Sequence, residues 1–267
     1  MERGSRCTPR MFRIIRPSYI STHSCSSVKA HPTVQFTVIV NPNSGPGSGE
    51  LPDEAFLAEV PKLNAYDNVR TVGYVKTGWA EDDLNTVLAE IATYAAWASK
   101  ANDPLMGVDG IFFDETPSEY DDAKHEWLNT AVQAVKTGEG FGDKTVGMLT
   151  FRTNTYRDSV LTTAVLNPGT ISGYTDIADI SVEFEKGYDQ WKTDGGLTDL
   201  QAEGLDPSKV AIIMYSLPES ALEEVVKEAE GTAQWLFLTS DDQAQGYLGF
   251  STMFANFVAS VDNGKTR

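Results

Sequence analysis

Short apolar runs alternate along this chain with longer stretches in which apolar residues recur every three or four positions. A bounded apolar run is typical of a buried strand, and the three-to-four spacing is typical of a helix. Their alternation indicates βα units around a parallel sheet. The pattern predicts seven strands, at Gln35–Asn41, Val69–Val75, Gly110–Asp114, Ala164–Asn167, Ile180–Glu185, Val210–Tyr215 and Trp235–Thr239. It predicts helices at Glu54–Leu63, Asp82–Ala98, Tyr120–Val135, Glu219–Ala229 and Tyr247–Val261.

The strand count indicates a barrel that is nearly complete. A (β/α)8 TIM barrel typically needs about 250 residues, and the chain has 267. We therefore predict an α/β fold, a (β/α)8 TIM barrel with a defective or missing first strand. The only candidate for that strand is Pro17–Ser21, and a barrel without it would keep two open edges. The segment Thr145–Arg152 does not fit the alternation, and we interpret residues 146–160 as an insertion.

The first 30 residues differ from the rest in charge. They carry six Arg or Lys side chains and one Glu, a net charge of +5, whereas the remaining residues carry −22. We predict that residues 1–30 are a basic arm outside the fold, either disordered or produced by a wrongly placed start site or exon boundary, and that residues 31–267 form one barrel domain. Both cysteines, Cys7 and Cys25, lie in the arm, so the predicted barrel needs no disulfide.

Composition excludes several kinds of partner. A net charge of −17 repels phosphate, which argues against nucleic acid and anionic membrane surfaces and favours a neutral or cationic substrate. No run approaches the roughly 18 apolar residues of a membrane span. Two Cys and three His argue against a zinc site. Hard cations bound by carboxylates from separate strands are the remaining metal alternative; we predict no metal, no cofactor and a monomer.

Two adjacent carboxylates follow the apolar strand Gly110–Asp114. Pro117 then ends the segment, because proline lacks the N–H that a ladder needs. In (β/α) barrels the chemistry lies at this carboxyl end of the strands. Because side chains alternate along a strand, Asp114 and Glu115 should point in different directions. The alternative is an acidic turn and helix cap.

Polar and aromatic residues also follow the other predicted strands. Amides and acids can hydrogen-bond sugar hydroxyls, and aromatic rings can stack on the apolar faces of pyranoses. Glycoside hydrolysis further needs two carboxyl groups beside the scissile bond, one protonated and one ionised. We select Asp114 and Glu185 as that pair. The full set of strand-end candidates is Asn41, Tyr74, Trp79, Asp114, Glu115, Asn167, Glu183, Glu185, Tyr215 and Asp241.

Several of these candidates have simpler interpretations. Asn41 precedes a proline and is also typical of a turn, and Trp79 is also typical of packing. Alternation along Ile180–Glu185 places Val182 and Phe184 on one face and Glu183 and Glu185 on the other. Glu183 could therefore be either a substrate contact or a solvated, salt-bridged position.

The chain resembles the spherulin-4 family, glycoside hydrolase family 135. The resemblance runs from about His31 to Thr239, and it is carried by the segments Phe36–Gly47, Val69–Val75, Gly110–Pro117, Leu166–Thr170, Ala178–Ile180 and Phe184–Glu185. It implies a (β/α)8 barrel and an endo-acting, retaining hydrolase of α-1,4-linked N-acetylgalactosamine in galactosaminogalactan, a fungal polysaccharide. It also implies that the protein is secreted or lies at the cell surface, although its N-terminus shows no secretory signal.

The resemblance implies catalytic roles for Asp114, Glu115 and Glu185. We assign Asp114 as nucleophile, Glu185 as general acid/base and Glu115 in support. Substrate contacts are expected from Asn41, Tyr74, Trp79, Asn167, Glu183 and Tyr215. Lys76 stands where the family often has His. The alternative function is a non-catalytic carbohydrate-binding or spore and cell-wall protein on the same scaffold.

Overall fold

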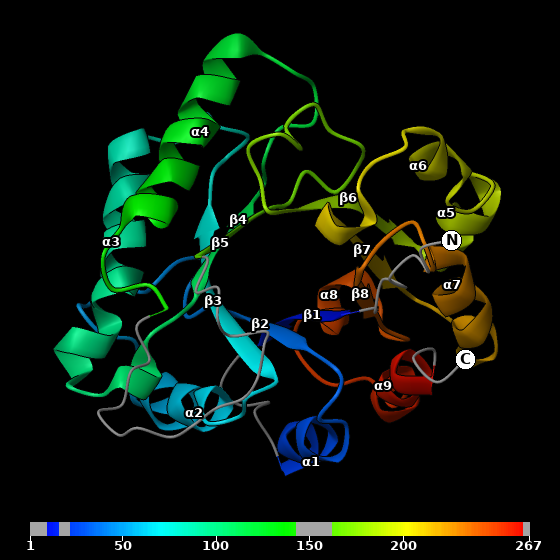
Figure 1. Ribbon diagram of the computed structural model, residues 1–267, viewed down its shortest axis with the longest axis horizontal. Helices are drawn as coiled ribbons and strands as arrows, with labels where there is room; N and C mark the ends of the chain where they lie inside the picture. The colour runs from blue at the N-terminus through cyan, green and yellow to red at the C-terminus, as the bar shows by residue number, and fades with distance from the viewer. Residues whose placement is uncertain (1–9, 16–21, 143–161, 264–267) are drawn as a thin grey trace, which may run out of the picture.

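Eight parallel strands close a barrel in the part of the chain that the computed structural model describes, residues 10–15, 22–142 and 162–263. Their order around the barrel follows the sequence, and β1 pairs with both β2 and β8 (Figure 1). The predicted (β/α)8 class is confirmed. The strands are β1 Arg10–Ile15, β2 Phe36–Val40, β3 Val69–Lys76, β4 Gly110–Asp114, β5 Thr163–Leu166, β6 Ile180–Gly187, β7 Val210–Tyr215 and β8 Trp235–Leu238.

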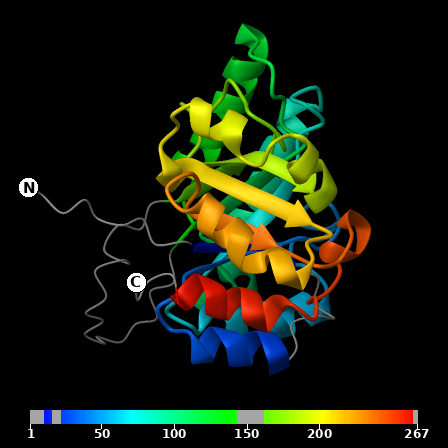
Figure 2. The same cartoon turned by 90° about the vertical axis from the view of Figure 1, so that its right-hand side faces the viewer.

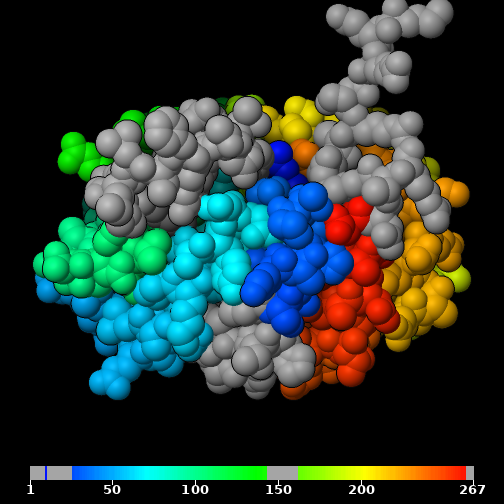
Figure 3. All heavy atoms as spheres, turned by 60° about the horizontal axis from the view of Figure 1, so that its bottom comes forward, coloured from blue at the N-terminus to red at the C-terminus, as the bar shows by residue number. Residues whose placement is uncertain are grey.

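Helices surround this barrel. They are α1 Thr22–Ala30, α2 Glu54–Asn64, α3 Leu84–Ala101, α4 Asp122–Thr137, α5 Tyr188–Thr193, α6 Thr198–Ala202, α7 Leu222–Ala229, α8 Gln243–Gly246 and α9 Phe254–Asn263, with 3-10 turns at η2 Pro104–Met106, η3 Pro207–Lys209 and η4 Glu219–Ala221. Figure 2 shows α7, α9 and α1 side by side, and Figure 3 shows the blue surface of α1 next to the red surface of α9. No helix in the described ranges is long and apolar enough to cross a membrane.

The first strand is not where the sequence placed it. We expected it at Pro17–Ser21, a segment that lies outside the described ranges. The structure forms the first strand from Arg10–Ile15. Backbone pairing runs from Met11 opposite Phe36 to Ile15 opposite Val40. Part of the basic arm thus supplies the strand that we expected to be defective or missing, and α1 follows it. The segment Thr145–Arg152 also lies outside the described ranges.

Alternation along the strands separates an inner from an outer core. Phe112 of β4 faces the inside of the barrel, whereas Ile111 and Phe113 pack outward against helices. The inner set comprises Ile39, Val72, Tyr74, Phe112, Val165, Ile180, Val182, Ala211, Ile213, Trp235 and Phe237. Asp114, two residues beyond Phe112, therefore also faces inward at the carboxyl end.

The predicted helix at Asp82–Ala98 is confirmed and extended as α3. Asp83 caps it by accepting the Asn85 N–H, and Asn102 ends it in the left-handed conformation. Its Tyr94 hydroxyl donates to Val40 O at 3.0 Å. A Cβ on Gly73 would lie 2.6 Å from the Tyr94 ring, so only glycine lets the helix approach β3 this closely.

Two predicted helix boundaries are wrong in ways that affect the site. Asp121 caps α4 by accepting the Lys124 N–H at 2.9 Å, which leaves Tyr120 in the preceding loop. The predicted helix Tyr247–Val261 begins only at Phe254, as α9, and Tyr247 lies in the loop between α8 and α9. Gly246 and Gly249 lie at this break, and glycine is a poor helix former.

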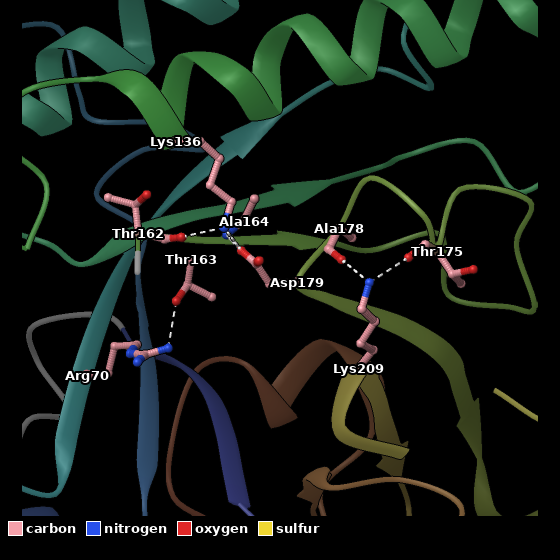
Figure 4. Close-up of polar contacts among 9 residues, drawn as sticks. All are labelled: Arg70, Lys136, Thr162, Thr163, Ala164, Thr175, Ala178, Asp179 and Lys209. Carbon is pink, nitrogen blue, oxygen red and sulfur yellow. Dashed lines mark hydrogen bonds and ion pairs between the residues drawn. The ribbon is translucent and has the colours of Figure 1, made fainter. Parts of the chain in front are cut away.

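Polar contacts join the amino ends of β3, β5 and β6 (Figure 4). Lys136 of α4 donates to Thr162 O at 2.6 Å and pairs with the Asp179 carboxylate. Asp179 also accepts the Ala164 N–H at 2.8 Å. Arg70 donates to the Thr163 hydroxyl at 2.6 Å. This is the end of the barrel at which polar residues serve stability, because the chemistry lies at the carboxyl ends of the strands.

Candidate active site

The amide of Asn167 joins two carboxylates at the carboxyl end of the barrel. Its Nδ2 donates to Asp114 Oδ1 at 2.8 Å and to Glu185 Oε2 at 2.9 Å. The three side chains come from the ends of β4, β5 and β6, which are neighbours in the barrel. The two carboxylate oxygens are therefore separated by no more than these two hydrogen bonds placed end to end.

A β-bulge directs Glu185 into this cluster. The register of β6 against β7 shifts between Val182 and Phe184, so Val182 lies opposite Ala211 and Glu185 opposite Ile213, both of them inner residues. Phe184 packs outward instead. The predicted face that paired Val182 with Phe184 and Glu183 with Glu185 is therefore wrong, because the bulge interrupts the alternation.

Two tyrosines hold the outer oxygens of the acid pair. The Tyr74 hydroxyl donates to Asp114 Oδ2 at 2.6 Å, and the Tyr247 hydroxyl donates to Glu185 Oε1. Burial, together with the adjacent carboxylates, raises the pKa of both hydroxyls well above the ordinary value. Both tyrosines thus remain neutral hydrogen-bond donors. Tyr247 also stacks on the inner residue Phe237, with ring centroids 6.1 Å apart.

Glu115 lies beside the pair in a strained backbone conformation, with φ of 53°. Its carbonyl accepts the Thr77 hydroxyl at 2.7 Å and the Trp79 N–H at 2.6 Å, which holds that conformation. Its N–H donates to Asp114 Oδ1 at 2.9 Å. The Glu115 Oε2 atom faces Lys76 Nζ at 3.5 Å. The expectation that Asp114 and Glu115 point in different directions agrees with these separate partners.

Four buried side-chain oxygens at this end of the barrel form no hydrogen bond within the described residues, although one of them, Glu115 Oε2, faces the Lys76 ammonium. They are Asn41 Oδ1, Glu115 Oε2, Thr116 Oγ1 and Asn167 Oδ1. Buried polar atoms are normally paired, so a group of unpaired acceptors requires an explanation. These atoms have almost no accessible surface, so a ligand could reach them only if the surrounding side chains moved.

The other predicted site residues differ in their burial and in the loops that carry them. Tyr215 ends β7, half-buried, and a Cβ on Gly187 would lie 3.0 Å from its ring. Trp79 is 56% exposed in the loop after β3. Asp241 lies in the loop after β8, where its carbonyl accepts the Ser216 N–H at 2.7 Å.

Glu183 is not brought to the acid pair. It is 1% exposed, and its carboxylate accepts the Ser172 N–H at 2.7 Å and the Ser172 hydroxyl at 3.1 Å. Burial raises the pKa of Glu183, against the effect of these hydrogen bonds. The side chain thus anchors the loop that follows β5.

Tyr247 is the site residue that sequence reasoning missed. We had placed it in a helix, where its position gave no reason to assign it to the site. The available signal was its place soon after the last strand, where the chain returns to the carboxyl face, next to Gly246. In the described ranges no group of three or more His, Cys, Asp or Glu residues is arranged to hold a metal ion.

Three comparisons relate this chain to known proteins. The sequence model of spherulation-specific family 4 matches residues 14–261. Spherulin-4 of Physarum polycephalum is 29% identical over 154 residues, which cover 57% of this chain and only 37% of that relative's length. The crystal structure of Aspergillus clavatus Sph3 in complex with GalNAc is similar with a TM-score of 0.83 and 30% identity, covering 97% of this chain and 100% of that one.

Proposed function

The chain belongs to spherulation-specific family 4, and from this premise we propose that it is an endo-acting glycoside hydrolase. Its substrate class is a polymer of α-1,4-linked N-acetylgalactosamine of the galactosaminogalactan type. The similarity to a structure in complex with GalNAc supports the amino sugar.

The observation that carries the proposal is the shared amide between Asp114 and Glu185. Retaining glycosidases place their two carboxyl groups about 5 to 5.5 Å apart, whereas inverting ones need about 6.5 to 9.5 Å to admit a water. Two hydrogen bonds of 2.8 and 2.9 Å, placed end to end, fall short of the inverting range. The geometry therefore supports retention.

Three donors reach Asp114, from Tyr74, Asn167 and the Glu115 N–H. These hydrogen bonds hold the carboxylate in one orientation, which suits a nucleophile that attacks the anomeric carbon. Glu185 would give its proton to the glycosidic oxygen as the bond breaks. It would then take a proton from the water that cleaves the glycosyl ester and restores Asp114.

Glu115 has a supporting role in this mechanism. Its N–H fixes one oxygen of Asp114, and its carboxylate, placed near the Lys76 ammonium, is available to a substrate donor. Asn41, Tyr74, Asn167 and Tyr215 would contact the sugar at the cleaved bond, and Trp79 would contact it from the rim.

Replacing either acid tests the proposal. We expect Asp114→Asn and Glu185→Gln each to lower the release of reducing ends from galactosaminogalactan by about a thousandfold or more, because residues that form and resolve a covalent intermediate act as a unit. Asp199→Asn, on the exposed surface of α6, is the matched control and should keep full activity. Unchanged turnover in both acid variants would reject the hydrolase. NMR can identify which anomer of the new reducing end forms first, and the α-anomer would indicate retention.

A carbohydrate-binding protein without catalysis is the second candidate. The similarity to a structure in complex with GalNAc favours it as much as it favours hydrolysis, since a bound sugar requires no reaction. Binding of the polymer by the wild-type chain without any new reducing ends would select this function.

A further inference from the structure

Two large apolar side chains are exposed in the described part of the chain, and both lie in loops at the carboxyl end of the barrel. Trp79 is 56% exposed and Tyr120 is 58% exposed. Trp79 is in the loop after β3 and Tyr120 in the loop after β4, and these strands are neighbours. Exposing a large ring forgoes the stabilisation that its burial would give. Finding both rings at the carboxyl end points to a shared use there.

Tyr120 is held rigidly for an exposed residue. Its ring stacks on buried Tyr174 at 5.7 Å between centroids with an angle of 23°, and His125 lies 5.5 Å away. A Cβ on Gly173 would lie 2.8 Å from the Tyr120 Cβ, so the chain presses closely against the tyrosine. With one side supported in this way, the exposed part of the ring forms a flat apolar surface.

The tyrosine beneath it is fixed by the backbone. The Tyr174 hydroxyl accepts the Asp121 N–H at 3.0 Å and donates to Glu119 O at 2.7 Å. These contacts lie on both sides of Tyr120 in sequence, so the loop that carries the exposed ring cannot move without breaking them.

This stack is built on the same two loops as the acid cluster. The loop with Tyr120 begins at Asp114, and the loop with Tyr174 begins at Asn167. The Thr116 N–H donates to Asn167 O at 3.1 Å, and the Gly173 N–H donates to Ser118 O at 3.0 Å. The ring is therefore connected to the site through two ordered loops.

We propose that Tyr120, supported by Tyr174, is a stacking platform for a sugar unit of the polymer away from the bond that is cleaved. The inference rests on the proposed function and extends it to a remote subsite. The exposed carboxylate of Asp176 pairs with His125 beside the stack, with 3.0 Å between Nε2 and Oδ2. That charge, with exposed Asp122 next to Tyr120 in space, disfavours an anionic sugar, so the platform accepts a neutral or deacetylated, cationic hexosamine.

Oligosaccharides of α-1,4-linked N-acetylgalactosamine of increasing length test the platform. Tyr120→Ala should lower kcat/KM about tenfold on the longest oligosaccharides, the scale of one lost aromatic contact with its buried area, and leave the shortest cleaved substrate unaffected. Tyr120→Phe keeps the ring and should keep wild-type values at every length. An equal loss at all lengths would indicate a role in folding alone and would overturn the proposal. The absence of any loss, at every length, would overturn it as well.

Matched variants separate binding from stability. Tyr66→Ala removes a tyrosine just before β3, at the amino end of the barrel, and should not change the dependence on length. If Tyr120→Ala does not fold, Tyr120→Leu keeps an apolar side chain without a flat ring and should show the same length-dependent loss.

Failure of the hydrolase would be distinguishable from failure of the platform. If the wild-type chain releases no reducing ends, retardation of wild-type and Tyr120→Ala chains in gels containing galactosaminogalactan tests the platform directly. Weaker retardation of the variant supports it, and equal retardation overturns it.

Discussion

At the scale of single residues, the acid pair depends on two neutral phenols whose positions were unequally predictable. Tyr74 lies on β3, two residues beyond the inner residue Val72, so strand alternation directs it inward. Tyr247 reaches Glu185 from the break between α8 and α9. Local periodicity contains no information about such a contact, because the chain has left regular structure there.

Removing the Tyr247 hydroxyl should impair catalysis without unfolding the chain. Tyr247→Phe keeps the stack on Phe237 but removes the donor that orients Glu185. We expect kcat to fall roughly tenfold to a hundredfold, since a small misplacement of a catalytic group costs this much. Kinetics with a defined oligosaccharide provide the measurement. A change in KM alone would show that Tyr247 binds substrate rather than positioning the acid.

The pH profile should show no deprotonation of these phenols near their ordinary pKa of 10.0. Burial and the adjacent carboxylates raise the pKa of both Tyr74 and Tyr247, so neither loses its proton in the working range. If the rate falls at alkaline pH in both the wild type and Tyr247→Phe, a group other than the Tyr247 hydroxyl causes the decline.

Glu183 should make stability depend on pH. Burial raises its pKa in the folded chain above the ordinary value of 4.5, so the folded state holds the proton more tightly than the unfolded state. The resulting stabilisation is fully present below pH 4.5 and is lost as pH rises through the folded pKa. Glu183→Gln avoids this loss and can still accept the Ser172 N–H.

We therefore expect Glu183→Gln to raise the melting temperature at pH 7 to 8, by about 2–4 °C for each kcal/mol regained, and to give no gain near pH 4. Thermal unfolding across this pH range measures the effect. A variant less stable than wild type at every pH would mean that the carboxylate's hydrogen bonds to Ser172 outweigh its desolvation.

At the scale of elements, β6 decides which acid reaches the site. Its bulge places Val182 and Glu185 on the inner face, an outcome that strict alternation along Ile180–Glu185 could not give. A bulge depends on the partner strand and the loop that Glu183 anchors. By contrast, β4 was predicted correctly to the residue, because its apolar run ends abruptly at Asp114 and no irregularity intervenes.

The amino ends of β5 and β6 depend on Asp179. This half-buried carboxylate satisfies the Ala164 N–H and pairs with Lys136. Asp179→Ala should cost about 1–3 kcal/mol, because a partly buried donor and a cation lose their partner. Chemical unfolding should detect the loss, whereas KM should stay unchanged because the contact lies at the opposite end of the strands from the acids. Lys136→Met, which leaves the Ala164 contact, should cost less, and the reverse order would contradict this account.

At the scale of the whole molecule, the barrel closes through a segment that charge patterning set apart. β1 comes from residues whose basic composition resembled a detached arm, so periodicity and composition both failed to identify it. Closure is further supported where His31 and Thr33, after α1, both bond Asp262 of α9. The alternating strands and helices were predictable from local patterns. The pairing of β1 with β8, which closes the barrel, was not, because it joins segments far apart in the sequence.

The amide that links the two acids also fixes a direction. Because the carboxylate of a nucleophile can only accept hydrogen bonds, the nitrogen of Asn167 faces Asp114, and its oxygen is thereby turned to the other side. The orientation of this amide is thus set by the reactive groups themselves. An aspartate in its place would have nearly the same size but would add a negative charge beside Asp114 and replace the shared donor with an acceptor, so the two acids would lose the group that links them.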